Sequence, residues 1–178
     1  MGDREEQRRV IVAGAAAYVL SRGLTGLSLR PLAAALGTSD RMLLYYFASK
    51  DELVGEVLRV LSIQLQGMLA AAMPRDRVSV KALVEEANEL LARPETYPAI
   101  AVCLELLGHA ARGEEPYASA ARTLLEDWIR WAEGHLEGPA RGRRDRALAA
   151  VACIEGILVL RAVGLGKRLR GALGGLLR

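Results

Sequence analysis

Residues 22–53 read RGLTGLSLRPLAAALGTSDRMLLYYFASKDEL, and the order of residue types in this stretch decides the fold. Gly23 is a natural end for a preceding helix over residues 4–22, because glycine readily takes the left-handed backbone conformation that ends helices. Ser28 is typical of an N-cap, whose hydroxyl accepts a hydrogen bond from a free backbone N–H. We therefore expect a second helix over residues 29–36.

A third, very short helix follows after a tight turn. Gly37 ends the second helix, and Ser39 is placed to cap a helix over residues 40–46. Two short helices joined by a tight turn that contains glycine are typical of the helix-turn-helix motif. In that motif the second helix enters the major groove of DNA, and its N-terminal residues contact the bases.

The tetrapeptide Ser49-Lys50-Asp51-Glu52 is a capping box. Its serine caps the helix, and its glutamate three positions later reaches back to a backbone N–H. The pattern predicts a long fourth helix over about residues 50–73, which would span roughly 35 Å at 1.5 Å per residue. A helix of that length can connect a DNA-binding head to a separate body.

The composition fits an all-α protein. The chain has 178 residues, of which 52% are hydrophobic and 25% are charged, which excludes an intrinsically disordered chain. Ala, Leu, Arg and Glu dominate, and no long strand-like alternation occurs. In the helix over residues 4–22, one apolar face carries Val10, Ala13, Ala17 and Leu20.

Several classes of protein are not expected. The longest run without charge, residues 60–74, is shorter than the roughly 20 residues of a membrane span. The charged N-terminus has no secretory signal, and Cys103 and Cys153 indicate reduced thiols in a cytoplasmic protein. His109 and His135 are too few for a metal site, and no nucleophile–base pair or phosphate loop suggests an enzyme or a cofactor. The basic segment 139–178 is interpreted as a solvated helix face.

The N-terminal stretch resembles the tetracycline-repressor (TetR) family of bacterial regulators over about fifty residues. The resemblance rests on Arg22-Gly23, Leu27-Ser28-Leu29-Arg30, Leu32-Ala33, Leu36-Gly37, Thr38-Ser39, Leu43 through Phe47, and Ser49-Lys50. It implies a helix-turn-helix domain over residues 1–50 and a helical effector-binding and dimerisation domain over residues 51–178. Two departures are Asp40-Arg41, where the family often has Lys and a small residue, and Tyr46, where it often has His.

Ten residues are the expected DNA contacts. Arg41 has a guanidinium fork that fits the O6/N7 edge of guanine. The resemblance implies that Tyr45 donates its hydroxyl to one phosphate and that Lys50 neutralises another. The full set is Ser28, Arg30, Thr38, Ser39, Asp40, Arg41, Met42, Tyr45, Tyr46 and Lys50.

Other roles are open for five of these residues. Arg41 alternatively contacts only the DNA backbone. Asp40 either accepts a hydrogen bond from a cytosine amine or stabilises its own helix N-terminus. Tyr45 and Tyr46 are alternatively core aromatics, and Lys50 is alternatively a solvated lysine.

Four further helices are expected over residues 79–93, 96–112, 115–136 and 143–165. The segments Cys103–Leu107 and Ile154–Ile157 resemble parts of one C-terminal type of the family. The family forms homodimers through its last two long helices, and small residues on the last one, Ala149, Ala152, Gly156 and Ala162, suit close approach of a partner. An intramolecular core is the alternative for that face. A dimer would read a pseudo-palindromic double-stranded operator.

The resemblance also implies a small, mostly hydrophobic effector that releases the DNA. Candidate pocket residues are Met68, Asn88, Leu91, Tyr97, Leu104, Glu105, Leu107, His109 and Trp128. Asn88, Glu105 and His109 would either orient such a ligand or make hydrogen bonds at helix junctions. The competing function is a helical dimeric ligand-binding or interaction protein whose degenerate head does not bind DNA.

Overall fold

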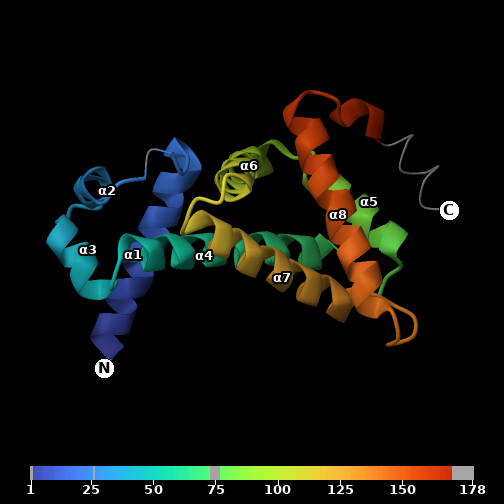
Figure 1. Ribbon diagram of the computed structural model, residues 1–178, viewed down its shortest axis with the longest axis horizontal. Helices are drawn as coiled ribbons and strands as arrows, with labels where there is room; N and C mark the ends of the chain where they lie inside the picture. The colour runs from blue at the N-terminus through green and yellow to red at the C-terminus, as the bar shows by residue number, and fades with distance from the viewer. Residues whose placement is uncertain (1, 26, 73–76, 170–178) are drawn as a thin grey trace. The chain divides into compact units, whose positions relative to one another are not determined.

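The computed structural model describes residues 2–25, 27–72 and 77–169, and these residues form helices throughout (Figure 1). The helices are α1 (Gly2–Arg22), α2 (Leu29–Ala35), α3 (Asp40–Tyr46), α4 (Lys50–Ala72), α5 (Val80–Leu90), α6 (Tyr97–Ala111), α7 (Tyr117–His135) and α8 (Arg143–Ala162), with 3-10 turns Pro94–Thr96 and Gly166–Arg168. The all-α prediction is confirmed, and the observed ends lie within a few residues of the expected ones.

The chain divides into two compact units. We call Met1–Ile63 with Ala101–Ala121 the head unit, and Gln64–Ile100 with Arg122–Arg178 the body unit. The head unit therefore contains the helix-turn-helix, the first part of α4 and most of α6. A compact unit is not the same as a functional domain, so the expected domain boundary near residue 50 stays a prediction.

The buried face of α1 differs from the expected apolar face by about one residue. Ile11, Val12 and Val19 are buried, whereas Val10 is 54% exposed. At Gly14 an added Cβ would come within 2.5 Å of Leu36 Cδ2. The missing side chain therefore lets the Leu36 side chain, at the end of α2, pack closely against α1.

Helix α4 buries one face in the head unit, through Leu53, Val54, Val57 and Leu58. By length and composition alone it is the one described helix that could cross a membrane. Core helices of soluble proteins share that property, and the first turns of α4 carry Lys50, Asp51 and Glu52.

In the body unit, α5 and α8 pack side by side (Figure 1). Leu83, Val84 and Ala87 of α5 are buried, as are Ala147 and Val151 of α8. A short bridge joins the segment just before α5 to the end of α7. In that bridge the N–H of Val78 donates to the carbonyl of His135 at 2.9 Å, and the N–H of Glu137 donates to the carbonyl of Val78 at 2.9 Å.

Candidate nucleic-acid interface

The turn between α2 and α3 is built as the sequence predicts. Gly37 has a φ of +66°, and the Thr38 N–H donates to the carbonyl of Ala33 at 2.9 Å. The Ser39 hydroxyl accepts from the N–H of Met42 at 3.1 Å, so the expected cap of α3 is present.

The expected cap of α2 was wrong in one respect. Ser28 has the extended backbone of an N-cap, yet its hydroxyl accepts no capping hydrogen bond. The usual donors to a capping hydroxyl are the second and third N–H groups of the helix. The third helical residue here is Pro31, which has no N–H to donate. A proline in the first turn thus removes one of the two groups that the serine was expected to satisfy.

One face of α3 is exposed and the opposite face is buried. Asp40, Arg41 and Tyr45 point outward, while Leu43 and Phe47 lie in the core. Tyr45 is 60% exposed, so it is not a core aromatic. Among the other expected contacts, Ser28, Arg30, Ser39 and Met42 are exposed, and Thr38, Tyr46 and Lys50 are half-buried.

Leu44 lies on the same outward face, although it is not among the ten expected contacts. Its side chain is 48% exposed although it is apolar. The sequence spacing indicates this position, because Leu44 follows Asp40 by four residues and Arg41 by three and so lies on the same side of the helix. An exposed leucine at such a position can contact the methyl group of thymine.

Asp40 makes a local contact. Its Oδ1 accepts from the N–H of Arg41 at 3.0 Å, at the N-terminus of α3. This contact matches the second role expected for Asp40, a carboxylate that stabilises the N-terminus of its own helix. Whether it also meets a base stays a prediction.

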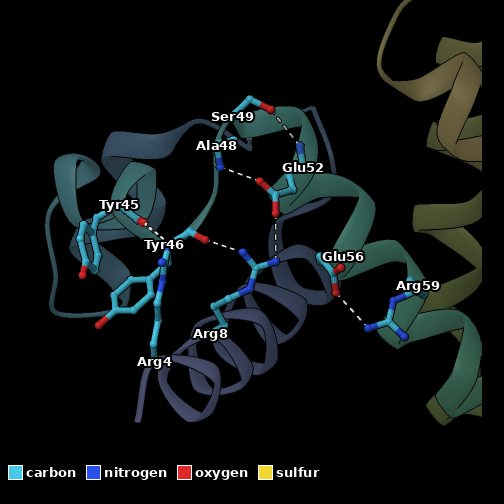
Figure 2. A network of polar contacts seen from close by, with 9 residues as sticks. All are labelled: Arg4, Arg8, Tyr45, Tyr46, Ala48, Ser49, Glu52, Glu56 and Arg59. Atoms are coloured by element: carbon cyan, nitrogen blue, oxygen red, sulfur yellow. Dashed lines mark hydrogen bonds and ion pairs between the residues drawn. The ribbon is translucent and has the colours of Figure 1, made fainter. Parts of the chain in front are cut away.

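Arg8 of α1 connects the end of α3 with the start of α4 (Figure 2). Its guanidinium donates to the carbonyl of Tyr46 and to Glu52 Oε1, the latter at 3.0 Å, and it lies 4.5 Å from the centre of the Phe47 ring. Helix C-terminal carbonyls attract cations, so this arginine also complements the dipole of α3.

The capping box of α4 is present with one change. The Ser49 hydroxyl accepts from the Glu52 N–H at 3.1 Å, as expected, but Glu52 Oε2 accepts from the N–H of Ala48 rather than of Ser49, at 2.5 Å. The Ala48 N–H and then Arg8 hold the pKa of the Glu52 carboxyl below its usual range. The C-terminal end of α3 is thus held, through Arg8 and the Ala48 N–H, by a carboxylate that is ionised at neutral pH.

Glu105 of α6 holds the loop between α1 and α2 within the head unit. Its Oε2 accepts from the backbone N–H groups of Leu24, at 2.6 Å, and Thr25, at 3.1 Å. The loop begins at Gly23, which has a φ of +78°. Among the candidate pocket residues, Glu105 therefore makes the hydrogen bonds that a helix junction requires.

The other polar candidates also have partners. Asn88 is 3% exposed, and its carbonyl and its Oδ1 each accept from Arg161 at 2.7 Å in the body unit. His109 contacts Glu114 in the head unit and stacks on Tyr117, with ring centres 4.4 Å apart. These bonds are the alternative that the sequence left open, and a ligand role for these residues stays a prediction.

Glu114 is the strongly perturbed carboxyl of this cluster. The guanidinium of Arg112, and then the ring of His109, lower its pKa to about 2. The contacts of Glu114 with Arg112 and His109 hold the turn that follows α6.

The remaining pocket candidates belong to both units. Leu104 and Leu107 are half-buried in the head unit, and Leu91 is buried in the body unit. Tyr97 and Met68 are exposed, and Trp128 is half-buried with its ring 5.5 Å from that of Trp131. A groove of about 720 Å³ lies elsewhere, between α1 and α4, and none of the candidates lines it. In the described parts of the chain, no group of His, Cys, Asp or Glu is arranged to hold a metal ion.

The last helix exposes an apolar stripe. Leu148, Val159, Leu160 and Val163 are exposed, and so are the small residues of the same side, among them Ala152 and Gly156. By contrast, the exposed residues of α7 are polar or glycine: Ser119, Arg122, Thr123, Arg130 and Gly134. The surface suited to association is therefore on α8.

Glu155 lies at the edge of that stripe, and the sequence pattern had assigned it no role. Its Oε2 is buried and has no hydrogen-bond partner. Burial raises the pKa of this carboxyl above its usual value. Burying a carboxyl without a hydrogen-bond partner costs free energy. In the sequence, the position of Glu155 inside an otherwise apolar pattern indicated such a buried carboxyl.

Comparison with known proteins agrees with this geometry. Residues 11–57 match the family model of bacterial regulatory proteins of the tetR family. No curated protein matches the chain.

Solved structures share the fold over nearly the whole chain. One from Rhodococcus sp., described as a TetR-family transcriptional regulator, has a TM-score of 0.75 at 17% identity and covers 100% of both chains. One from Streptomyces coelicolor A3(2), described as a transcriptional regulator, has a TM-score of 0.68 at 23% identity and covers 89% of this chain and 88% of that chain. One from Saccharomonospora viridis, also described as a transcriptional regulator and solved with choline, has a TM-score of 0.64 at 20% identity and covers 96% and 95%.

Proposed function

We propose that this chain, whose residues 11–57 match the family model of bacterial regulatory proteins of the tetR family, binds a pseudo-palindromic DNA operator as a homodimer and represses transcription. The observation that carries the proposal is the outward face of α3. There Arg41, Leu44 and Tyr45 are exposed on the second helix of a helix-turn-helix, while Leu43 and Phe47 fix that helix to the core.

The side chains on this face have distinct roles in the proposal. Arg41 is close to the N-terminus of α3, where a recognition helix contacts base edges, and its fork suits guanine. Tyr45 lies near the C-terminal end, where a hydroxyl meets the phosphate backbone. Lys50, at the start of α4, adds a positive charge for a second phosphate.

Dimerisation is the second part of the proposal. One seven-residue recognition helix reads too few base pairs to be selective in a genome, and a two-fold dimer doubles the number. The exposed apolar stripe of α8 is the surface that supports it, because such stripes on soluble proteins mark interaction sites.

The third part is release from DNA by a small, mostly apolar effector bound within residues 51–178. A protein of the same fold from Saccharomonospora viridis was solved with choline, a quaternary ammonium ion, so choline is tested first as the cationic alternative to an apolar effector. An effector acts only if it prefers the conformation that does not bind DNA, since equal affinity for both conformations shifts no equilibrium.

The experiment is a selection of bound duplexes from a random double-stranded pool at two salt concentrations. Enrichment of one pseudo-palindrome, with affinity that falls as salt rises, supports the proposal. Arg41→Ala and Tyr45→Phe should then bind the selected duplex more weakly, while Arg93→Ala, an exposed arginine of the body unit, should not. No enrichment by a folded, dimeric protein at low salt would contradict it. The selected duplex also allows effectors, choline first, to be tested by release of DNA.

A further inference from the structure

We propose that Arg4, at the start of α1, is a DNA-phosphate contact that works together with Tyr45 of the recognition helix. This inference rests on the proposed DNA binding and adds to it a residue outside the helix-turn-helix. Arg4 Nη2 donates to the carbonyl of Tyr45 at 3.2 Å, and its guanidinium carbon lies 5.2 Å from the centre of the Tyr45 ring. Figure 2 shows the two side chains next to each other at one edge of the head.

Among the described residues, Arg4 makes no close ion pair, which distinguishes it from the other arginines near it, although its charge acts at longer range on Glu52. Arg8 pairs with Glu52, Arg9 with Glu6, and Arg59 with Glu56. Arg4 has no carboxylate partner among the residues that the structure describes. A guanidinium has five N–H donors, and Arg4 uses one of them on the Tyr45 carbonyl. The remaining donors are available to an anion.

Exposure separates Arg4 from Arg8 as well. Arg8 is half-buried and committed to holding α3 and α4 together, whereas Arg4 is exposed. The carbonyl and the ring face of Tyr45 restrain the guanidinium on two sides. A restrained guanidinium gives up less freedom when it binds an anion, so it binds more tightly than a freely moving arginine.

The position of Arg4 favours phosphate over a base. It contacts the C-terminal end of α3, whereas the bases are read by the N-terminal residues of a recognition helix. The Tyr45 hydroxyl at that end is a proposed phosphate donor. A planar guanidinium matches two phosphate oxygens at once, so the pair forms a composite anion site.

The alternative is a purely structural role, in which Arg4 only fixes Tyr45 and the end of α3. The dependence of binding on salt separates the two roles. Removing one charged group from a phosphate lowers the slope of log Kobs against log salt by about 0.9. A misplaced recognition helix weakens binding without removing a charge–phosphate interaction of this kind.

The test compares Arg4→Ala, Arg4→Lys and the matched control Arg9→Ala on the selected duplex over a range of salt concentrations. For a dimer, Arg4→Ala should lower the slope by about 2, since one phosphate in each half-site is no longer neutralised, and should weaken binding ~10-fold or more at low salt. Arg4→Lys should keep the slope, and Arg9→Ala should change neither quantity. Equal thermal unfolding of the variants establishes that the fold is intact.

A second measurement replaces single phosphates of the duplex with neutral methylphosphonates. One position per half-site should weaken binding of the parent protein and have no further effect on Arg4→Ala. If Arg4→Ala keeps the parental slope, or if every methylphosphonate weakens parent and variant equally, the Arg4 contact is refuted while DNA binding stands. If the parent protein binds no duplex at all, the proposed function itself fails.

Discussion

Oε2 of Glu105 accepts a hydrogen bond from the backbone N–H of Leu24 at 2.6 Å, across 81 positions of the chain. One carboxylate of α6 thereby closes the loop that separates α1 from the helix-turn-helix, and it also accepts from the N–H of Thr25. The acidic side chain in this otherwise apolar stretch of α6 therefore holds the loop between α1 and α2.

Replacing Glu105 with Ala should release this loop. Two backbone N–H groups are left without their acceptor, and we expect a decrease of about 1–3 kcal/mol in the free energy of unfolding. Hydrogen exchange followed residue by residue is the measurement, since the N–H groups of Leu24 and Thr25 should become less protected before the rest of α1. Glu85→Ala, which removes an exposed carboxylate from α5, is the control. Unchanged exchange at Leu24 would show that the contact does not hold the loop.

Gly23→Ala should destabilise the protein for two separable reasons. A φ of +78° strains any residue with a Cβ by about 1–2 kcal/mol. The added Cβ would also lie 2.5 Å from Glu105 Oε1, so the carboxylate must move. Gly113→Ala is the matched control, because its φ is +70° and an added Cβ meets nothing within 4 Å.

Chemical denaturation of both variants measures the difference. Gly113→Ala should show the backbone strain alone, and Gly23→Ala should be less stable than Gly113→Ala. Equal destabilisation of the two variants would mean that the Glu105 carboxylate moves aside without a decrease in the free energy of unfolding.

Glu155→Gln should stabilise the protein at neutral pH. Burial raises the folded-state pKa of Glu155 above the unfolded value of 4.5, so the folded protein holds this proton more tightly than the unfolded chain. That contribution is complete below the unfolded-state pKa and disappears as the pH rises through the folded-state pKa. Glutamine stays neutral, so the variant does not lose this contribution to the free energy of unfolding as the pH rises.

Thermal unfolding at several pH values tests this direction. The advantage of Glu155→Gln over the parent should be small under acidic conditions, below the unfolded-state pKa, and should grow as the pH rises to neutral. Glu85→Gln should show no such growth. A pH-independent difference would mean that the carboxyl of Glu155 does not titrate in the folded protein as burial predicts.

Val159→Arg should disrupt the proposed dimer. Val159 is 49% exposed in the middle of the apolar stripe of α8, and a two-fold interface would bury the new charge twice. We expect dimerisation to weaken by at least ~100-fold, because an unpaired buried charge costs several kcal/mol. Sedimentation equilibrium of the variant and of Glu85→Arg, a charge change on the exposed side of α5, measures it. If the Val159→Arg variant still forms the dimer, the interface does not lie on α8.

The local signals in the sequence predicted the helices well, because caps and glycine turns act over three or four residues. Ser39 caps α3 and Ser49 caps α4 as expected. The failures are also local in origin. Pro31 deprives Ser28 of a donor, and Glu52 reaches one residue further back than the usual capping box.

Local sequence signals of this kind do not predict contacts between distant segments of the chain. Neither periodicity nor spacing tells which carbonyls Arg8 reaches, or that Glu105 binds a loop 80 residues away. The close packing of Leu36 against α1 at Gly14 likewise becomes visible only when α2 is placed against α1. Arg4 and Leu44 were missed for related reasons, since one belongs to another helix and the other looks like a core residue.

The contact between Arg4 and Tyr45 has a practical consequence for handling the protein. Helix α1 begins at Gly2, which lies about 3 Å along the helix axis from Arg4, so a peptide tag added before this helix would lie close to Arg4. An acidic tag there would compete with the proposed DNA phosphate for the guanidinium of Arg4. Binding constants for this chain should therefore be compared before and after the tag is cleaved.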